Sequence, residues 1–182
     1  MPDVAQAWAF LRNSDPIASA EQVDAAVRRV AAEVEAKLGG SYPLVLAVMG
    51  GAVVFAGQLL PMLRFPIDFD YVHASRYGKA TRGAGIEWRV SPPDLVAGRV
   101  VLIVDDILDH GETMAAIRAR LLELGATAVH SAVLVEKVLD RQKPIHADFV
   151  GLSIPDRFVF GCGMDAKGFW RNLPEIRAMK EG

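Results

Sequence analysis

Three carboxylates stand within a five-residue stretch of this sequence, directly after a run of apolar residues. Asp105 and Asp106 follow the run VVLIV, and Asp109 comes three residues later. Like charges this close together are costly unless a cation or hydroxyl donors compensate them. The cluster therefore favours a binding site at the end of a buried strand. Its ligand would carry hydroxyl groups or be a cation.

The residues after Asp109 favour phosphate binding. They lead into a helical pattern over 112–124 and are His110, Gly111, Glu112 and Thr113. The glycine lets the backbone turn tightly, the first helical turn offers unpaired N–H groups, and the threonine adds a hydroxyl donor. Open α/β sheets bind ligands at the carboxyl ends of their strands. The stretch therefore predicts a site for a phosphate monoester and a polyol.

A simpler interpretation of the same residues stays open. Asp109 can be a helix N-cap, the common role of an Asp just before a helix, and Asp105 and Asp106 can be a solvated strand end. Each feature taken alone favours this interpretation. Their combination after a strand that is apolar on both faces favours the ligand site.

Alternating strand and helix patterns surround this stretch. A helix is predicted over 19–38, because Ser19 and Gln22 resemble a capping box and valines recur at helical spacing up to Gly39-Gly40. Strand-like runs occupy 43–48, 67–75, 99–106, 128–135, 148–152 and 158–160, and helical spacing returns over 52–63. Strands alternating with helices predict an open α/β sheet.

Residues 76–93 interrupt this pattern. They contain four basic residues, three glycines and two prolines, with little apolar periodicity. The composition predicts a long loop or a loosely paired hairpin. A loop of this length in a compact domain is often functional, and a solvated surface hairpin is the alternative.

Composition excludes several classes of protein. The chain has 182 residues, of which 52% are hydrophobic, which suits one domain. A net charge of −2 gives no general basic field for nucleic acid. The single cysteine, Cys162, excludes an internal disulfide framework and fits a reducing compartment. With neither a signal-peptide pattern nor a membrane-length apolar run, the sequence predicts a cytoplasmic protein without a membrane partner.

The segment VLIVDDILDHGETM at 101–114 resembles the phosphoribosyl-pyrophosphate signature of type I phosphoribosyltransferases. That signature is a hydrophobic strand followed by two acidic residues, two apolar residues, Asp, any residue, Gly, any residue and Thr. The resemblance extends to the hypoxanthine-guanine branch and covers most of residues 40–175. Its further elements are Gly50-Gly51, Tyr77-Gly78, Lys137 and DFVGLSIPDRFVFGCGMD at 148–165.

This resemblance implies a fold and a reaction. The fold is a mainly parallel twisted sheet flanked by helices, with a small hood and a long flexible loop. A single domain would span 1–182, with a core of about 40–160 and a hood from the N-terminal segment and about 145–182. The reaction is purine salvage: the 5-phosphoribosyl group passes from 5-phosphoribosyl-1-pyrophosphate to hypoxanthine or guanine, giving IMP or GMP and pyrophosphate. Mg²⁺ is the implied cofactor, and a homodimer or homotetramer the implied assembly.

The resemblance also implies roles for the acidic stretch. Asp105 and Asp106 would approach the ribose hydroxyls and a magnesium ion. Asp109 would be the catalytic residue that exchanges a proton with N7 of the purine. The 5′-phosphate would be cradled by Asp109, His110, Gly111, Glu112 and Thr113.

Residues elsewhere would bind the base and pyrophosphate. Lys137 would point at the 6-oxo group, Phe158 would stack on the base, and main-chain groups of Val159 and Asp165 would read its other edge. The Asp165 side chain would ligate a second magnesium. Pyrophosphate would be held by Arg171 and by the loop of Met49, Gly50 and Gly51.

Three positions depart from the family pattern. Some members have Lys where Met49 stands, and a small hydroxyl residue is frequent where this chain has His110. The long loop often opens with Ser-Tyr, whereas here it opens with Arg76-Tyr77. These changes remove one charge contact and one hydroxyl donor, and add a positive charge to the loop.

Taken singly, the second-half residues are ordinary. Lys137, Asp165 and Arg171 are typical of solvated charges, Phe158 is typical of a core residue, and Asp156 is interpreted as part of the turn after Pro155. Other functions also stay open: an enzyme of the same class acting on xanthine or a pyrimidine, an RNA-binding regulator of the same fold, and a catalytically silent module. The dispersed basic residues weigh against the regulator, and the intact Asp triplet against the silent module.

Overall fold

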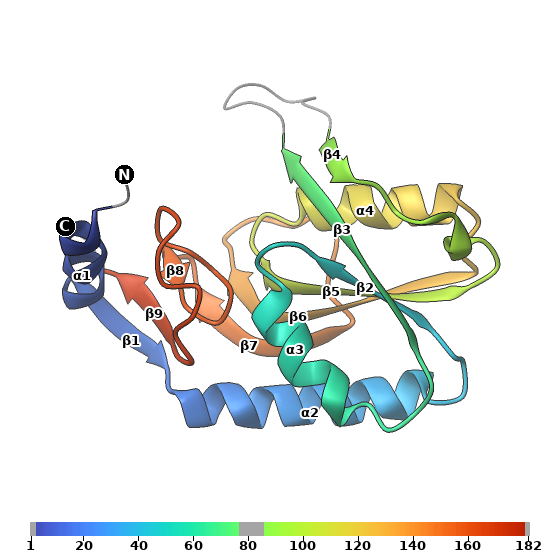
Figure 1. Cartoon of the computed structure of the whole chain (residues 1–182), viewed down its shortest axis with the longest axis horizontal. Helices are drawn as coiled ribbons and strands as arrows, with labels where there is room; N and C mark the ends of the chain where they lie inside the picture. Colours follow the sequence, from blue (N-terminus) through green and yellow to red (C-terminus); the bar gives the residue numbers. More distant parts are fainter. Residues whose placement is uncertain (1–2, 77–85, 181–182) are drawn as a thin grey trace.

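The computed structural model describes residues 3–76 and 86–180, which form two sheets with helices around them (Figure 1). The larger sheet has the strand order β4-β3-β2-β5-β6-β7. Its strands are β2 (Leu44–Val48), β3 (Asp68–Arg76), β4 (Ile86–Val90), β5 (Val100–Leu108), β6 (Ala128–Val138) and β7 (Phe149–Pro155). The pairs from β3 across to β7 are parallel, and β4 joins β3 antiparallel. The predicted mainly parallel α/β sheet is confirmed.

Helices cover both faces of this sheet. Helix α2 (Ala20–Leu38) and helix α3 (Val53–Leu59) lie on one face, and α4 (Glu112–Glu123) lies on the other (Figure 1). Side chains of β2 alternate between the two: Val45 and Ala47 pack toward α2 and α3, whereas Leu44 and Leu46 pack toward α4. Strands covered on both faces read as continuous apolar runs. Among the described residues, no helix has the length and apolarity that crossing a membrane requires.

Helix α2 begins where the sequence predicts. The Ser19 hydroxyl accepts a hydrogen bond from the Gln22 backbone N–H, and the Gln22 side chain accepts one from the Ser19 N–H. This reciprocal capping box satisfies two donors that the first turn leaves unpaired. Every valine of the predicted stripe is buried against the sheet: Val23, Val27, Val30 and Val34.

Some boundaries differ from the predicted ones. Strand β5 continues to Leu108 rather than ending at the acidic pair, because its pairing with β6 runs on to the pair Leu108↔Glu136. The helix predicted over 52–63 ends at Leu59, and a 3-10 turn (Leu60–Met62) follows, since Pro61 lacks the N–H that an α-helix needs. The segment predicted as a loop or hairpin contains β4, which pairs with β3. Tyr77 lies outside the described residues, and of Arg76 only its place in β3 is described.

A second sheet joins the two ends of the chain. Its antiparallel strands β1 (Ser14–Ala18), β9 (Ile176–Met179) and β8 (Val159–Phe160) lie beside the larger sheet in the order β1-β9-β8 (Figure 1). Helix α1 (Val4–Arg12) precedes β1, and the ring of Trp8 meets that of Trp170, in the connection between β8 and β9, edge to face at 5.0 Å. The sequence patterns predict β8 but not α1, β1 or β9.

Candidate active site

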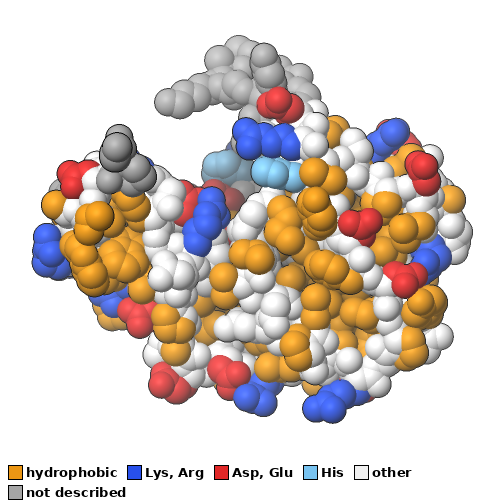
Figure 2. All heavy atoms as spheres, in the orientation of Figure 1, with side chains coloured by type: hydrophobic (Ala, Val, Ile, Leu, Met, Phe, Trp, Pro, Cys, Tyr) orange, Lys and Arg blue, Asp and Glu red, His pale blue; other side chains and the backbone are white. Residues whose placement is uncertain are grey.

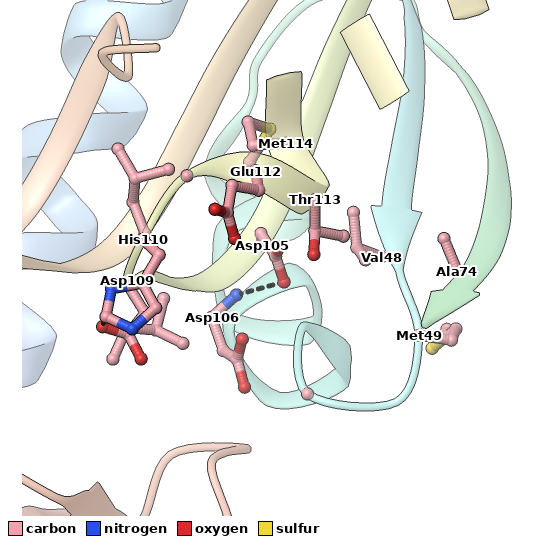
Figure 3. Close-up of a pocket in the computed structure, with 14 residues that line it drawn as sticks. Val48, Met49, Ala74, Asp105, Asp106, Asp109, His110, Glu112, Thr113 and Met114 are labelled. Atoms are coloured by element: carbon pink, nitrogen blue, oxygen red, sulfur yellow. Dashed lines mark hydrogen bonds and ion pairs between the residues drawn. The ribbon is translucent and has the colours of Figure 1, made fainter. Parts of the chain in front are cut away.

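A cavity of about 330 Å³ opens where β5 ends and α4 begins. Figure 2 shows charged and histidine side chains gathered in a hollow between the two sheets, whereas hydrophobic side chains are exposed on the flanks. The cavity is lined from three strands (Figure 3): by Val48 at the end of β2 with Met49 and Gly51 after it, by Ala74 of β3, and by residues 105–114. The acidic stretch and the Gly50-Gly51 loop, separate in the sequence, therefore meet at one cavity.

The two adjacent carboxylates lie on the floor of this cavity. The Asp106 backbone N–H donates to Oδ1 of Asp105 at 2.9 Å (Figure 3). Burial, and next the charge of Asp106, raise the pKa of Asp105 well above its ordinary value. Burial also raises the pKa of Asp106, although a hydrogen bond with Asp105 and the positive charge of Arg171 act against that rise. Such a pair is stabilised in its charged form by a bound cation.

The loop after β2 approaches the acidic pair closely. A Cβ atom on Gly51 would lie 1.9 Å from Oδ2 of Asp106, and a Cβ atom on Gly163 would lie 1.9 Å from the carbonyl oxygen of Gly51. Neither position accepts a side chain without a shift of its neighbours. The Met49–Gly50 peptide bond is cis. The backbone at Gly51 is thus packed between the Asp106 carboxylate and the backbone at Gly163.

The turn into α4 depends on Gly111. This residue is the N-cap of the helix and has φ +85°, a left-handed conformation that suits glycine. Glycine has no side chain with which to cap the helix. Because Gly111 occupies the N-cap position, the simpler interpretation of Asp109 as the N-cap is wrong. The first-turn residues Glu112 and Thr113 line the cavity. Backbone N–H groups at such a helix start are a suitable site for a phosphate.

A second cavity, of about 200 Å³, adjoins the first. Its lining residues come from β5, β6 and the segment around β8, and they are Asp106, Ile107, Asp109, Lys137, Phe158, Val159, Met164 and Asp165. Both cavities share Asp106, Ile107 and Asp109. The five residues that the resemblance assigns to the base and to N7 are all in this group.

Lys137, which lines this second cavity, lies between two carboxylates. Its Nζ atom is 3.3 Å from Oδ2 of Asp109 and 3.4 Å from Oδ1 of Asp156. The lysine side chain is largely buried, whereas that of Asp156 is 56% exposed. Sequence reasoning assigned Asp156 only to a turn, because a lone Asp after Pro155 carries no signal of its distant partner.

The other carboxylate oxygen of Asp109 faces His110. Oδ1 of Asp109 and Nδ1 of His110 are buried, lie 3.6 Å apart and have no hydrogen-bond partner within the described structure. The His110 ring lies beside the Asp109 carboxylate (Figure 3). Asp109 therefore stands between a lysine and a histidine, with one oxygen still able to accept a hydrogen bond.

Of the remaining predicted residues, Phe158 and Asp165 line the second cavity, whereas Arg171 does not. Phe158 is 54% exposed just before β8, so it is not a core residue. The Asp165 carboxylate accepts a hydrogen bond from the Gly168 N–H and forms an ion pair with Arg171. Arg171 also donates to the Gly163 carbonyl oxygen at 2.6 Å, and it lines neither cavity. Within residues 3–76 and 86–180, no three His, Cys, Asp or Glu side chains gather closely enough to hold a metal ion by themselves.

Comparison with known proteins identifies the family to which this architecture belongs. Residues 14–167 match the family model of the phosphoribosyl transferase domain. The sheet, the acidic strand end and the glycine turn into α4 are thus features of a phosphoribosyltransferase, and the chain belongs to this family.

Proteins similar to this chain indicate the branch of the family to which it belongs. The chain is 32% identical over 163 residues to a hypoxanthine-guanine phosphoribosyltransferase of Bacillus subtilis (strain 168), covering 89% of this chain and 91% of that one. It is also 32% identical to the Aquifex aeolicus (strain VF5) enzyme of that name, with 88% and 92% covered. A crystal structure of a Bacillus anthracis hypoxanthine-guanine phosphoribosyltransferase superimposes with a TM-score of 0.82 at 29% identity, covering 90% and 96%. The chain is an enzyme of this hypoxanthine-guanine branch.

Proposed function

We propose that the enzyme transfers the 5-phosphoribosyl group from 5-phosphoribosyl-1-pyrophosphate to hypoxanthine or guanine, giving IMP or GMP and pyrophosphate. The observation that carries this proposal is the pair of adjoining cavities that share Asp106 and Asp109. One has the features of a phosphate and ribose site, and the other those of a base site. The shared wall lies where ribose and base must meet.

The first cavity suits the ribose 5-phosphate. The phosphate would lie on the backbone N–H groups of Gly111, Glu112 and Thr113, with the Thr113 hydroxyl as a further donor. Asp105 and Asp106 would accept hydrogen bonds from the ribose hydroxyls. Their negative charge would also favour the positive charge that develops on the ribose ring as the bond to pyrophosphate breaks.

The second cavity suits a 6-oxopurine. The Lys137 ammonium would donate to the 6-oxo group, the exposed ring of Phe158 would stack on the base, and main-chain groups of Val159 and Asp165 would contact its far edge. Asp109, which lines this cavity, would take the proton that N7 carries as the purine nitrogen attacks the ribose carbon. The purine supplies the nucleophile, so no enzyme nucleophile is needed.

We propose Mg²⁺ as the cofactor. The carboxylates of Asp105 and Asp106 are adjacent, and burial raises the pKa of both, so they fit a cation that takes most ligands from water and substrate oxygens. Bound magnesium would neutralise charge on the leaving pyrophosphate. Asp165 would hold a second ion after its release from Arg171, which would then reach pyrophosphate together with the loop of Met49, Gly50 and Gly51.

The rest of the proposal concerns the whole molecule. The chain would act as one domain in the cytoplasm, with the small sheet as a hood beside the base. By its family, the chain would form a homodimer or homotetramer, with neither nucleic acid nor membrane as a partner.

A direct assay tests this function. The protein is incubated with 5-phosphoribosyl-1-pyrophosphate, Mg²⁺ and one base at a time, and nucleotide is separated by chromatography. The five bases are hypoxanthine, guanine, xanthine, adenine and uracil. We expect IMP and GMP to form fast, little product from xanthine and almost none from adenine or uracil. Efficient use of adenine or uracil alone would overturn the assignment of the base site.

A further inference from the structure

Lys143 is a buried lysine outside both cavities. It lies in the connection between β6 and β7, and only 6% of its side chain is exposed. Its ammonium group donates to the carbonyl oxygen of Leu108 at 3.0 Å, to that of Lys137 at 2.6 Å and to Oε1 of Glu136 at 3.2 Å. Three donors therefore have three acceptors, and the charge of the lysine is balanced by Glu136.

Two of these acceptors lie next to the proposed base-binding groups. The Leu108 carbonyl belongs to the peptide bond that leads into Asp109, and the other carbonyl belongs to Lys137 itself. The ladder between β5 and β6 has its last pair at Leu108↔Glu136. Beyond that pair the two strands are no longer paired. The hydrogen bonds of the Lys143 ammonium connect their backbones there.

The same segment also supports the turn into α4. A Cβ atom on Gly111 would lie 3.3 Å from Cγ2 of Ile145, 3.4 Å from Cδ of Pro144 and 3.6 Å from Cβ of Lys143. Ile145 is buried in the cluster that α4 forms on its face of the sheet. The connection after β6 thus contacts the phosphate turn on one side and joins the two strand ends on the other.

We propose that Lys143 is a positioning residue that sets the distance between Asp109 and Lys137, and hence the register of N7 and the 6-oxo group of the base on these two side chains. This inference rests on the proposed function. A displacement of about 1 Å in such a group can lower a rate roughly 100-fold. The alternative is that Lys143 only stabilises the fold, as a satisfied buried ion pair.

The test compares Lys143→Met and the milder Lys143→Gln with the wild-type enzyme, at a temperature well below each unfolding midpoint. The turnover number kcat for hypoxanthine is measured per folded molecule, together with KM for both substrates. We expect kcat to fall roughly 10- to 100-fold for Lys143→Met and less for Lys143→Gln, whose amide still donates hydrogen bonds. Lys143→Gln carries the test if Lys143→Met does not fold.

Two control variants separate positioning from stability. Val34→Ala removes buried volume from α2, far from the cavities, and should lower the unfolding midpoint while keeping kcat. Glu136→Gln keeps an acceptor for Lys143 and should keep kcat near the wild-type value. A double-mutant cycle adds a further readout: Lys143→Met should cost less in an Asp109→Asn background than in the wild type, because both changes act on one group.

The outcomes are distinct. If the wild-type enzyme forms no nucleotide from any base, the proposed function fails. If the wild-type enzyme is active and the folded Lys143 variants keep its kcat, or lose it equally in both backgrounds, the positioning role alone is overturned.

Discussion

The ammonium group of Lys137 lies 3.3 Å from a carboxylate oxygen of Asp109, although Lys137 belongs to β6 and Asp109 follows β5. In the proposed reaction, one would address the 6-oxo group of the base and the other N7. Because the two side chains are in contact, the charge and position of each affect those of the other. Variants of the two residues separate their contributions.

Asp109→Asn should lower kcat for hypoxanthine by roughly 10²–10⁴, because an amide cannot take the N7 proton. Substrate KM values should change little, since Asn has the same shape. Stability should also change little, because Gly111 rather than Asp109 occupies the N-cap and Lys137 keeps its contact with Asp156. Steady-state kinetics and urea unfolding check both points. The exposed Asp140→Asn is the matched control, and near-normal turnover in Asp109→Asn would remove Asp109 from the chemistry.

Lys137→Met should sharply reduce the use of hypoxanthine and guanine while keeping apolar bulk beside the base. An ammonium only donates hydrogen bonds, so it pairs with a 6-oxo acceptor and faces the amino donor of adenine without a partner. A site built around such a bond can discriminate by about 10⁴–10⁵. The ratio of kcat/KM for hypoxanthine to that for adenine should therefore be large in the wild type and collapse in the variant. An unchanged ratio would contradict this role.

Asp156→Asn should have a small effect. The carboxylate is more than half exposed, and exposed ion pairs contribute little, so we expect KM for hypoxanthine to change by about fivefold or less. The change should shrink further at high salt, which screens exposed charges. Initial rates at low and high ionic strength measure it. A loss as large as that of Lys137→Met would show that Asp156 is needed to hold the lysine.

Asp105→Asn should change the pH dependence of stability. Burial raises the pKa of Asp105 well above its ordinary value, so above about pH 4 the native state keeps a proton that the unfolded chain loses. This contribution makes the native state less stable as the pH rises, and Asn removes it. Without metal or substrates, the variant should therefore gain stability relative to the wild type between about pH 4.5 and about pH 7.5.

Urea unfolding at those two pH values measures this difference in free energy. The exposed carboxylate variant Asp140→Asn should show no such gain. Added Mg²⁺ should stabilise the wild-type protein more than Asp105→Asn. A difference that is the same at both pH values would show that Asp105 is ionised in the folded protein without a cation.

Local patterns predicted the central part of this structure well. The stripe of valines and the Ser19–Gln22 capping box are contained in one segment, and the apolar strands need no distant partner to be recognised. Strand β1 was missed because its sequence, SDPIA, is short, contains Pro16 and forms a strand only by pairing with residues 176–179. The predicted end of β5 was early because two carboxylates look like a strand end, whereas the ladder with β6 continues past them.

The residues of the candidate site also divide into those that local patterns predicted and those that they missed. The acidic stretch and its glycine turn form one continuous motif, so the sequence alone predicted a phosphate site there. Lys143 stands in the polar run DRQKPIH, which is typical of a surface loop. The burial of Lys143 depends on the contact between the β6–β7 connection and the end of β5. Asp156 contacts Lys137 only because β6 and β7 pair in parallel. Residues of this kind emerge only from the three-dimensional structure.

The pairing of β1 with β9 fixes an order of events during synthesis. Strand β1 leaves the ribosome early, but β9 emerges only after the whole six-stranded sheet, and β9 also pairs with β8, which carries Val159. A nascent chain can therefore complete the glycine turn into α4 while the small sheet beside the second cavity is still unformed. The second cavity is the last part of the candidate site that the growing polypeptide completes.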